Sequence, residues 1–415
     1  MKNVMPRAAG SRSALSIVWA AVLAALAGCA TPQMPGTPGE AAKVEAADAL
    51  PITEFYTAPA DLSHSKPGDL IRQEQAQGYT LPRGARAVRI VYHSLSATGA
   101  DVPTSAVVLI PAGKAPQGGW PVIAWAHGTS GVSQQCAPSL MRDVYYGEEG
   151  LYDMLRAGFA VIASDYHGLG TPGPHQYVNK IAQAHDVIYS VPAARAAVPE
   201  LGARWVADGH SQGGLASWGV AEQERAIQDP NYLGAVSVAG AARESDFFAH
   251  LDTTPGVGFY LAFMAYGLHA RYPEFAPSEL LSDKVMAHYD DVTTHGCWFY
   301  GYAMYAGESG GLLRDPKAVN PWVHRMFVEN ALGAAPVSGP LFVIGGEGDQ
   351  TVPIDAIRDA VAAGCRTGLT ISFKSYPGLD HDPTMIKSIP AQLAWIRDRF
   401  AGKPAPSTCP VPPHT

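Results

Sequence analysis

The most specific chemical signal in the sequence is the pentapeptide at residues 209–213, which reads G-H-S-Q-G. A G-x-S-x-G motif marks a nucleophile elbow when a strand precedes it and a helix follows it. Residues 203–207 are typical of a strand, and residues 212–226 carry apolar side chains at helical spacing. We therefore predict that Ser211 lies in a strained turn with its hydroxyl exposed, where the two glycines leave room for strand and helix to approach. The alternative is a tight turn that carries an ordinary serine.

A serine hydroxyl is a weak nucleophile and needs a base that a third group orients. Asp349 follows the predicted strand 340–345, and His381 follows the predicted strand 369–376. Serine, acid and histidine occur along the chain in the order of an α/β-hydrolase triad. The sequence therefore predicts a triad of Ser211, Asp349 and His381.

Other acidic residues compete for the role of the acid. Asp355 is a weaker candidate, and Asp349 would be an ordinary turn residue if no triad formed. Asp380 and Asp382 flank His381, but we rank them lower because adjacent residues rarely fold back onto the distal ring nitrogen. Without a triad, His381 would be a histidine of a surface loop.

The negative oxygen that forms during attack on a carbonyl needs backbone N–H donors. The first is expected from Gln212, the residue after the nucleophile. The second is expected from the loop after the predicted strand 121–126, which reads H-G-T, and we choose Thr129 over Gly128. The sequence has neither an H-E-x-x-H motif nor clustered cysteines, so we predict no metal and no cofactor.

Length and charge limit the class of protein. The chain has 415 residues, 47% hydrophobic and 16% charged, enough for one large α/β domain with an insertion. The formal net charge is -8, and no basic patch or arginine-rich segment occurs. Nucleic acid is therefore not an expected partner.

Alternating strands and helices define the predicted fold class. The alternation runs from residue 87 to residue 239 and resumes from 340 to 400. It predicts an α/β-hydrolase fold, with a mostly parallel central sheet and helices on both faces. Residues 241–339 break the alternation and are rich in aromatic side chains, so we predict an inserted, mostly helical cap there. The core then comprises residues 51–240 and 340–415, the second part with a C-terminal tail.

Local patterns add detail to this prediction. Residues 87–96 and 103–111 are expected to form a pair of strands around a turn, and residues 51–84 are expected to be mostly irregular. One helix is expected over 147–158. The last helix is expected over about 383–400, with an interruption before Pro390.

The first 28 residues have the pattern of an export signal. Three basic residues precede the uncharged, largely apolar stretch 14–27, which is too short to span a membrane. The stretch ends in L-A-G-C, which resembles a bacterial lipobox with Cys29 as the acylated residue. The alternative is a plain signal peptide with an incidental cysteine. We predict an exported protein whose lipid anchor holds it to a membrane of the cell envelope, the outer membrane, with residues 29–50 as a flexible tether.

Four cysteines remain after Cys29, namely Cys136, Cys297, Cys365 and Cys409. An even number in an exported chain predicts two disulfides, with three connectivities open. The alternative, four buried free thiols, is the weaker one because of the export signal.

Several of these motifs resemble the secretory lipase family of α/β-hydrolases, the group of fungal lipase A. The resemblance spans about residues 55–409. It rests on the elbow and on F-Y at 55–56, P-G-D-L-I-R at 67–72, H-G-T at 127–129, C-A-P-S at 136–139, G-D-Q-T-V-P at 348–353 and G-L-D-H at 378–381. It implies the disulfide pairs Cys136–Cys297 and Cys365–Cys409. Gln212 stands where the fungal lipase has a small residue.

The resulting hypothesis is a serine carboxylic-ester hydrolase of the esterase or lipase type that forms an acyl-enzyme on Ser211. An aromatic cap favours small-molecule or lipid esters with an apolar acyl or aryl group. One alternative is a serine peptidase or aminopeptidase on the same fold, although the propeller repeats of many such peptidases are absent from the sequence. Another is a catalytically silent, lipid-tethered binding protein, against which the intact order of serine, aspartate and histidine argues.

Overall fold

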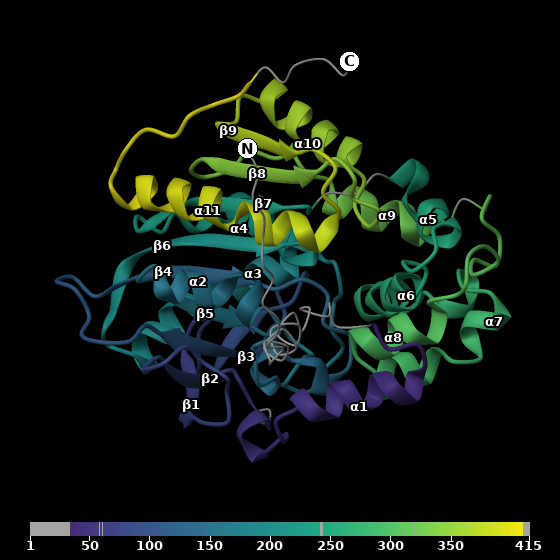
Figure 1. Ribbon diagram of the computed structural model, residues 1–415, viewed down its shortest axis with the longest axis horizontal. Helices are drawn as coiled ribbons and strands as arrows, with labels where there is room; N and C mark the ends of the chain where they lie inside the picture. Colours follow the sequence, from purple (N-terminus) through teal and green to yellow (C-terminus); the bar gives the residue numbers. More distant parts are fainter. Residues whose placement is uncertain (1–33, 58, 60, 241–243, 319, 410–415) are drawn as a thin grey trace, which may run out of the picture. The chain divides into compact units, whose positions relative to one another are not determined.

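A computed structural model describes residues 34–57, 59, 61–240, 244–318 and 320–409. Its centre is a nine-stranded sheet in the order β1-β2-β3-β5-β4-β6-β7-β8-β9 (Figure 1). The strands are β1 Leu70–Ala76, β2 Arg86–Leu95, β3 Asp101–Ile110, β4 Trp120–Ala126, β5 Ala160–Ser164, β6 Leu201–His210, β7 Tyr232–Val238, β8 Leu341–Gly346 and β9 Ile371–Tyr376. From β5 to β9 in the sheet order, all neighbouring strands are parallel. The predicted mostly parallel sheet is therefore confirmed.

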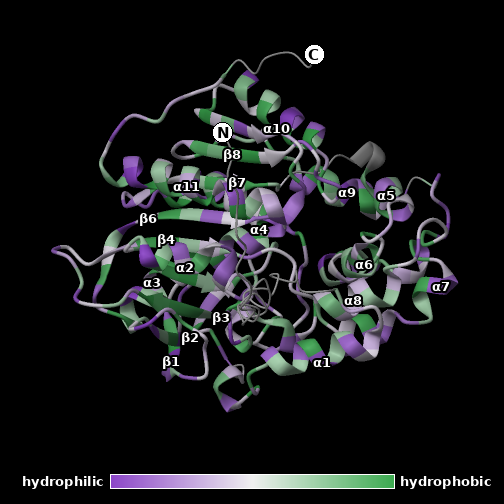
Figure 2. Ribbon diagram, in the orientation of Figure 1, coloured by the Kyte–Doolittle hydropathy of each residue, from purple (hydrophilic) through white to green (hydrophobic). Residues whose placement is uncertain are grey.

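The central parallel strands are largely apolar because helices cover both faces of the sheet. All residues of β5 and β8 are buried, and in β4 only Pro121 is partly exposed. Figure 2 shows the same property as predominantly hydrophobic colouring of the central strands. This apolar layer fixes the positions of the loops that follow each strand.

The first three strands are antiparallel and lie at one edge of the sheet. The predicted pair β2 and β3 is confirmed, with a register from Arg86↔Ile110 to Leu95↔Asp101. Residues 51–84 are mostly irregular, as predicted, but the unpredicted strand β1 lies within them and pairs with β2. β1 reads L-I-R-Q-E-Q-A and is only partly buried, so its hydropathy does not distinguish it from a polar loop.

Eleven α-helices are described. They are α1 Pro38–Asp48, α2 Tyr152–Arg156, α3 Lys180–Ala197, α4 Gln212–Ile227, α5 Glu244–Thr253, α6 Tyr260–Arg271, α7 Asp283–Met286, α8 Trp298–Tyr305, α9 Pro321–Asn330, α10 Ile354–Arg366 and α11 His381–Phe400. In Figure 1, α2 and α11 lie in front of the sheet, and α3 and α4 lie behind it. The elbow helix α4 packs against both α3 and the strand β6 that precedes it.

Two of the predicted helices differ from the structure. Residues 147–151 form a single π-helical turn, interrupted at Gly150 with φ 157°, and α2 follows as a short helix. The predicted interruption of the last helix was also wrong, because α11 continues through Pro390. Pro390 cannot donate to the carbonyl of Ile386, but both residues are exposed, so water can satisfy that carbonyl.

The segment between β7 and β8, residues 244–339, holds helices α5 to α9 and has an apolar core of its own. We call this segment the insertion. Large side chains such as Phe259, Phe263 and Phe275 are fully buried in it. Disulfides join Cys136 to Cys297 and Cys365 to Cys409, so the pairing implied by the family resemblance is confirmed. The first of these bonds ties the insertion to the loop after β4.

The predicted tether contains an ordered helix, which is a correction. Thr37 caps α1, Pro38 occupies its first turn, and α1 packs against α8 of the insertion. The carboxylate of Glu45 accepts the backbone N–H groups of Cys297 at 3.1 Å and Tyr300 at 2.8 Å, at the start of α8. The predicted signal peptide and Cys29 lie outside the described residues. Within the described ranges, no helix is both long enough and apolar enough to cross a bilayer.

Candidate active site

Ser211 lies in a strained turn between β6 and α4, as the motif predicts. Its backbone angles are φ 58° and ψ -121°, a combination that residues other than glycine seldom adopt. A Cβ at Gly213 would lie 1.8 Å from the carbonyl oxygen of Ala126, and a Cβ at Gly209 would lie 2.2 Å from the carbonyl oxygen of Gly213. Glycine is therefore required on both sides of the serine for strand and helix to pack so closely.

Asp349 and His381 meet at the carboxyl end of the sheet. Asp349 follows β8, and its Oδ2 lies 2.7 Å from Nδ1 of His381. Its Oδ1 accepts the backbone N–H groups of Thr351 and Val352, each at 2.8 Å. Because a carboxylate accepts hydrogen bonds, this contact places a proton on Nδ1 and leaves a lone pair on Nε2.

The acids that compete with Asp349 have other partners. Oδ1 of Asp380 accepts the N–H of His381 at 2.8 Å and that of Gln350 at 2.9 Å, so it caps α11 and ties it to the turn after β8. Asp355 pairs with Arg358 on α10. Among the described residues, only Asp349 is hydrogen-bonded to the imidazole of His381.

The other ring nitrogen of His381, Nε2, is buried and has no hydrogen-bond partner among the described residues. The ring lies against that of His210, the residue before the serine, with centroids 4.5 Å apart. Burial opposes protonation, but the carboxylates of Asp349, Asp382 and Asp380 outweigh it and raise the pKa of His381 above its ordinary value. A basic nitrogen without a partner beside the elbow is suited to general-base chemistry.

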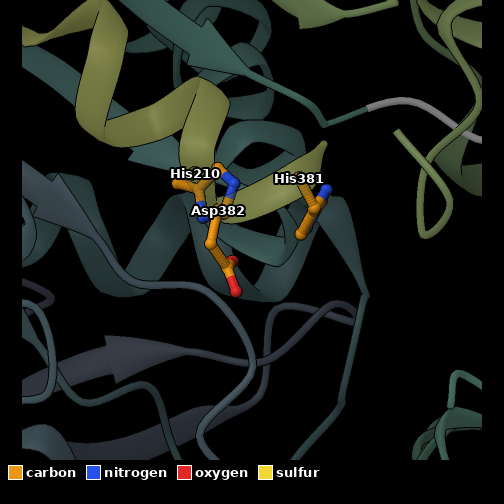
Figure 3. A group of neighbouring side chains, drawn as sticks. All are labelled: His210, His381 and Asp382. Atoms are coloured by element: carbon orange, nitrogen blue, oxygen red, sulfur yellow. The ribbon is translucent and has the colours of Figure 1, made fainter. Parts of the chain in front are cut away.

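His210, His381 and Asp382 are the described residues that could hold a metal ion, since their ligand atoms lie within 4.8 Å of one another (Figure 3). Burial and then the neighbouring His381 lower the pKa of His210 well below its ordinary value, so this ring is neutral. Its Nδ1 lies 2.8 Å from the hydroxyl of Tyr146. A metal on Nε2 of His381 would remove the lone pair that a base requires. We therefore interpret His210 and Asp382 as neighbours that set the electrostatic environment of His381, not as metal ligands.

The predicted oxyanion residues lie beside the serine. Thr129 and Gln212 line one cavity together with Ser211. The backbone N–H of Thr129 and that of Gln212, the first residue of α4, donate to no other described residue. Gly128 has a different role, because a Cβ there would lie 2.2 Å from the hydroxyl oxygen of Tyr146. Two unpaired N–H groups beside a nucleophile are the donors that an oxyanion requires.

The side chain of Gln212 is held by His175, a residue that no sequence motif marks. Burial lowers the pKa of His175 to about 3, so its ring is neutral. Nδ1 of His175 donates to the carbonyl of His167 at 2.9 Å, and Nε2 accepts from Nε2 of Gln212 at 3.2 Å. A histidine between Pro174 and Gln176 gives no motif that would have predicted this contact.

Thr129 is also held by two tyrosines, Tyr177 and Tyr145, that no motif marks. Its hydroxyl lies 2.6 Å from that of Tyr177, and its carbonyl accepts a hydrogen bond from Tyr145. Tyr145 has a positive φ of 65° and is followed by Tyr146, which contacts the ring of His210. The tyrosine pair at 145–146 was visible in the sequence, but only the fold places it under the H-G-T loop.

A small cavity of about 80 Å³ adjoins Ser211. It lies between the carboxyl end of the sheet and the insertion, so both supply its walls. Most of its larger lining side chains are apolar or aromatic, namely Leu215, Phe247, Tyr260, Met264, Met326, Phe327 and Val352. Such a lining suits an apolar ligand that is oriented by a few polar groups.

The sheet topology and the elbow define the class of this protein as an α/β-hydrolase. The model of the secretory lipase family matches residues 143–408, which is more than half of the chain, so the protein belongs to that family. This membership makes it an ester-hydrolysing enzyme of the lipase and esterase type.

Individual relatives share about a quarter of their residues with this chain or fewer. The chain is 23% identical over 402 residues to a secreted triacylglycerol lipase of Malassezia furfur, covering 88% of this chain and 83% of the relative. It is 25% identical over 375 residues to a protein of Mycobacterium tuberculosis named a probable inactive lipase, covering 84% and 82%.

Solved structures share the fold. Lipase A of Candida antarctica in its closed state superposes with a TM-score of 0.73 at 20% identity, covering 88% of this chain and 91% of that chain. A rice cell wall degrading esterase of Xanthomonas oryzae gives a TM-score of 0.67 at 18% identity, covering 82% and 100%.

Proposed function

We propose that the protein hydrolyses carboxylic esters through Ser211, His381 and Asp349, by way of an acyl-enzyme. Nε2 of His381 takes the proton of the Ser211 hydroxyl as its oxygen attacks the ester carbonyl. The imidazolium then gives that proton to the leaving alcohol. A water molecule, activated by the same nitrogen, releases the acid and restores the serine. Asp349 keeps the imidazole in the required tautomer throughout.

The observation that carries this proposal is the 2.7 Å contact between Asp349 and His381 beside a strained nucleophile elbow. The contact frees Nε2 as an acceptor, and the ring that bears it lies against the residue before Ser211. The N–H groups of Gln212 and Thr129 would hold the oxyanion that forms. A relative named as inactive does not weaken the proposal, because the name describes that protein. This chain carries the serine, the histidine, the aspartate and both oxyanion N–H groups.

The substrate class follows from the cavity walls. Methionine, leucine and phenylalanine side chains line it, while Thr129, Asn330 and Thr351 supply a few polar groups. Burying an apolar acyl or aryl group in such a cavity contributes roughly 25 cal/mol of favourable free energy per Å² of apolar surface removed from water. We therefore propose apolar acyl or aryl esters, including lipid esters, as substrates, with the insertion acting as a cap over them.

Replacing the nucleophile tests the proposal. Ser211→Ala should lower kcat on p-nitrophenyl esters by about 10⁴-fold or more and abolish covalent labelling by a fluorophosphonate. Ser282→Ala is the control, because its hydroxyl is buried in the insertion and has no hydrogen-bond partner among the described residues. Wild-type hydrolysis by Ser211→Ala would refute the mechanism. Cleavage of aminoacyl amides without cleavage of esters would instead favour a peptidase.

We also propose export and acylation at Cys29, supported by the L-A-G-C sequence and by two disulfides in the folded chain. The expected mature N-terminus is a diacylglycerol-modified cysteine, which membrane fractionation and mass spectrometry of the purified protein would detect. Cys29→Ser should release the protein from the membrane fraction. A mature protein that begins elsewhere, or a Cys29→Ser variant that stays membrane-bound, would contradict the anchor.

A further inference from the structure

The hydroxyl groups of Thr129 and Tyr177 form an isolated pair beside the nucleophile. Their oxygens are 2.6 Å apart, and this is the only hydrogen bond found for either hydroxyl among the described residues. Both residues line the cavity that contains Ser211 and Gln212. Both are buried, so the pair is largely shielded from bulk solvent.

One of the two O–H groups in this pair has no acceptor in the part of the chain that the structure describes. Two hydroxyl groups carry two protons, and a single hydrogen bond between them uses only one. The second proton therefore has no acceptor among the described residues. A buried hydroxyl without an acceptor is unfavourable, so such a group is usually retained for a ligand or a water molecule.

The chemistry of the two hydroxyls decides which proton is left over. A phenol, with an ordinary pKa near 10, is a better hydrogen-bond donor than an aliphatic alcohol, and the alcohol oxygen is the better acceptor. Burial raises the pKa of Tyr177 further, so it stays protonated at all working pH values. Tyr177 therefore donates to Oγ1 of Thr129, and the O–H of Thr129 is left to donate elsewhere.

We propose that the side-chain hydroxyl of Thr129 is a third oxyanion donor, and that Tyr177 is a positioning residue that orients it. The proposal rests on the proposed function, because it concerns the same carbonyl. When Ser211 attacks, the carbonyl π electrons move to oxygen, and the negative oxygen accepts hydrogen bonds from the N–H groups of Thr129 and Gln212. The threonine hydroxyl adds a third bond without transferring its proton.

Tyr177 is held rigidly enough for this role. Its backbone N–H donates to the carbonyl of His175 at 2.8 Å, and its ring packs against the rings of His175 and Phe263. Because His175 also holds the side chain of Gln212, one short segment of chain supports both oxyanion residues. A donor fixed before the reaction needs no reorganisation when charge develops.

The test is Thr129→Val, which removes the hydroxyl, keeps the backbone N–H and nearly conserves side-chain volume. We expect kcat on a p-nitrophenyl ester to fall by about 10²-fold, with KM within about twofold, since the bond forms mainly in the transition state. The Ki of a trifluoromethyl ketone, which forms a tetrahedral oxyanion adduct with the serine, should rise by a similar factor. Thr129→Ser should recover most of the lost kcat, and Tyr177→Phe should give an intermediate loss.

Two controls separate this role from a structural one. Thr293→Val and Tyr305→Phe make the same changes at buried hydroxyls of the insertion that bond to backbone carbonyls away from the serine. The unfolding midpoint of each variant shows whether it folds. If Thr129→Val keeps wild-type kcat and Ki while Ser211→Ala is inactive, the third donor is refuted and the proposed function stands. If Ser211→Ala is also fully active, the proposed function itself fails.

Discussion

At the scale of single residues, the surroundings of the proposed base, His381, act on its pKa in two opposing directions. Three carboxylates, those of Asp349, Asp380 and Asp382, act on His381 and raise its pKa, against the opposing effect of burial. His210 adds no positive charge because it is neutral. Among the described residues only Asp349 is hydrogen-bonded to the ring, so Asp382 acts through its charge alone and can be changed without breaking the proposed triad.

This separation predicts how activity depends on pH. General-base catalysis needs the neutral imidazole, so the acid limb of kcat/KM should lie above pH 6.5, the ordinary value for histidine. Asp382→Asn removes a negative charge that favours the imidazolium and lowers the pKa of His381. The acid limb should then move to lower pH by about half a unit or more. The measurement is kcat/KM from pH 5 to pH 9 for wild type and variant.

The control for this prediction is Glu148→Gln, which neutralises an exposed carboxylate that does not contribute to the pKa of His381. Its acid limb should coincide with that of the wild type. A limb that moves to higher pH in Asp382→Asn, or that moves equally in both variants, contradicts the electrostatic role of Asp382.

At the scale of elements, the sequence was most informative where backbone packing dictates residue type. The elbow could be predicted because close strand–helix packing at Gly209 and Gly213 excludes a Cβ. The order of Ser211, Asp349 and His381 could be predicted because each follows a strand, and the strands before Ser211 and Asp349 are buried for most or all of their length. Those strands are apolar runs, which hydropathy detects.

Elements that depend on tertiary pairing were harder to predict. β1 lies at the sheet edge and gains its register from hydrogen bonds with β2, which leave no periodic apolar pattern. α1 carries local signals, since Thr37, Pro38 and Glu40 form a typical helix start, but its alanine-rich composition is also that expected of a flexible tether. The docking of α1 depends on hydrogen bonds from the backbone N–H groups of Cys297 and Tyr300 to Glu45, and these residues are 252 and 255 positions away along the chain.

The support of the oxyanion loop was not predictable for the same reason. His175 and Tyr177 lie in a loop with no recognisable motif, and their partners Gln212 and Thr129 are 37 and 48 residues distant. Only the topology, which places β4 beside both β5 and β6, brings these loops together. The proposed catalytic residues therefore follow from motifs, whereas the residues that hold them follow from the fold.

At the scale of the whole molecule, the two disulfides occupy different positions relative to the site. Cys136–Cys297 joins the loop after β4, which carries Thr129, to the insertion, and the N–H of Trp298 donates to the carbonyl of Ser130 at 2.9 Å. Cys365–Cys409 joins the end of α10 to the C-terminal segment. The first bond therefore connects the oxyanion loop with the insertion, whereas the second secures the periphery of the core.

Removing each disulfide separately should separate stability from activity. The loops span 161 and 44 residues, which correspond to roughly 5 and 4 kcal/mol of loop entropy as upper values. Both serine double variants should therefore unfold at lower temperature.

Only Cys136→Ser with Cys297→Ser should also lower kcat/KM, by about tenfold, because the oxyanion loop and the insertion are then no longer covalently joined. Calorimetry and ester kinetics well below both unfolding transitions would measure the two effects. Equal losses of kcat/KM in both variants would show that this bond has no specific influence on the site.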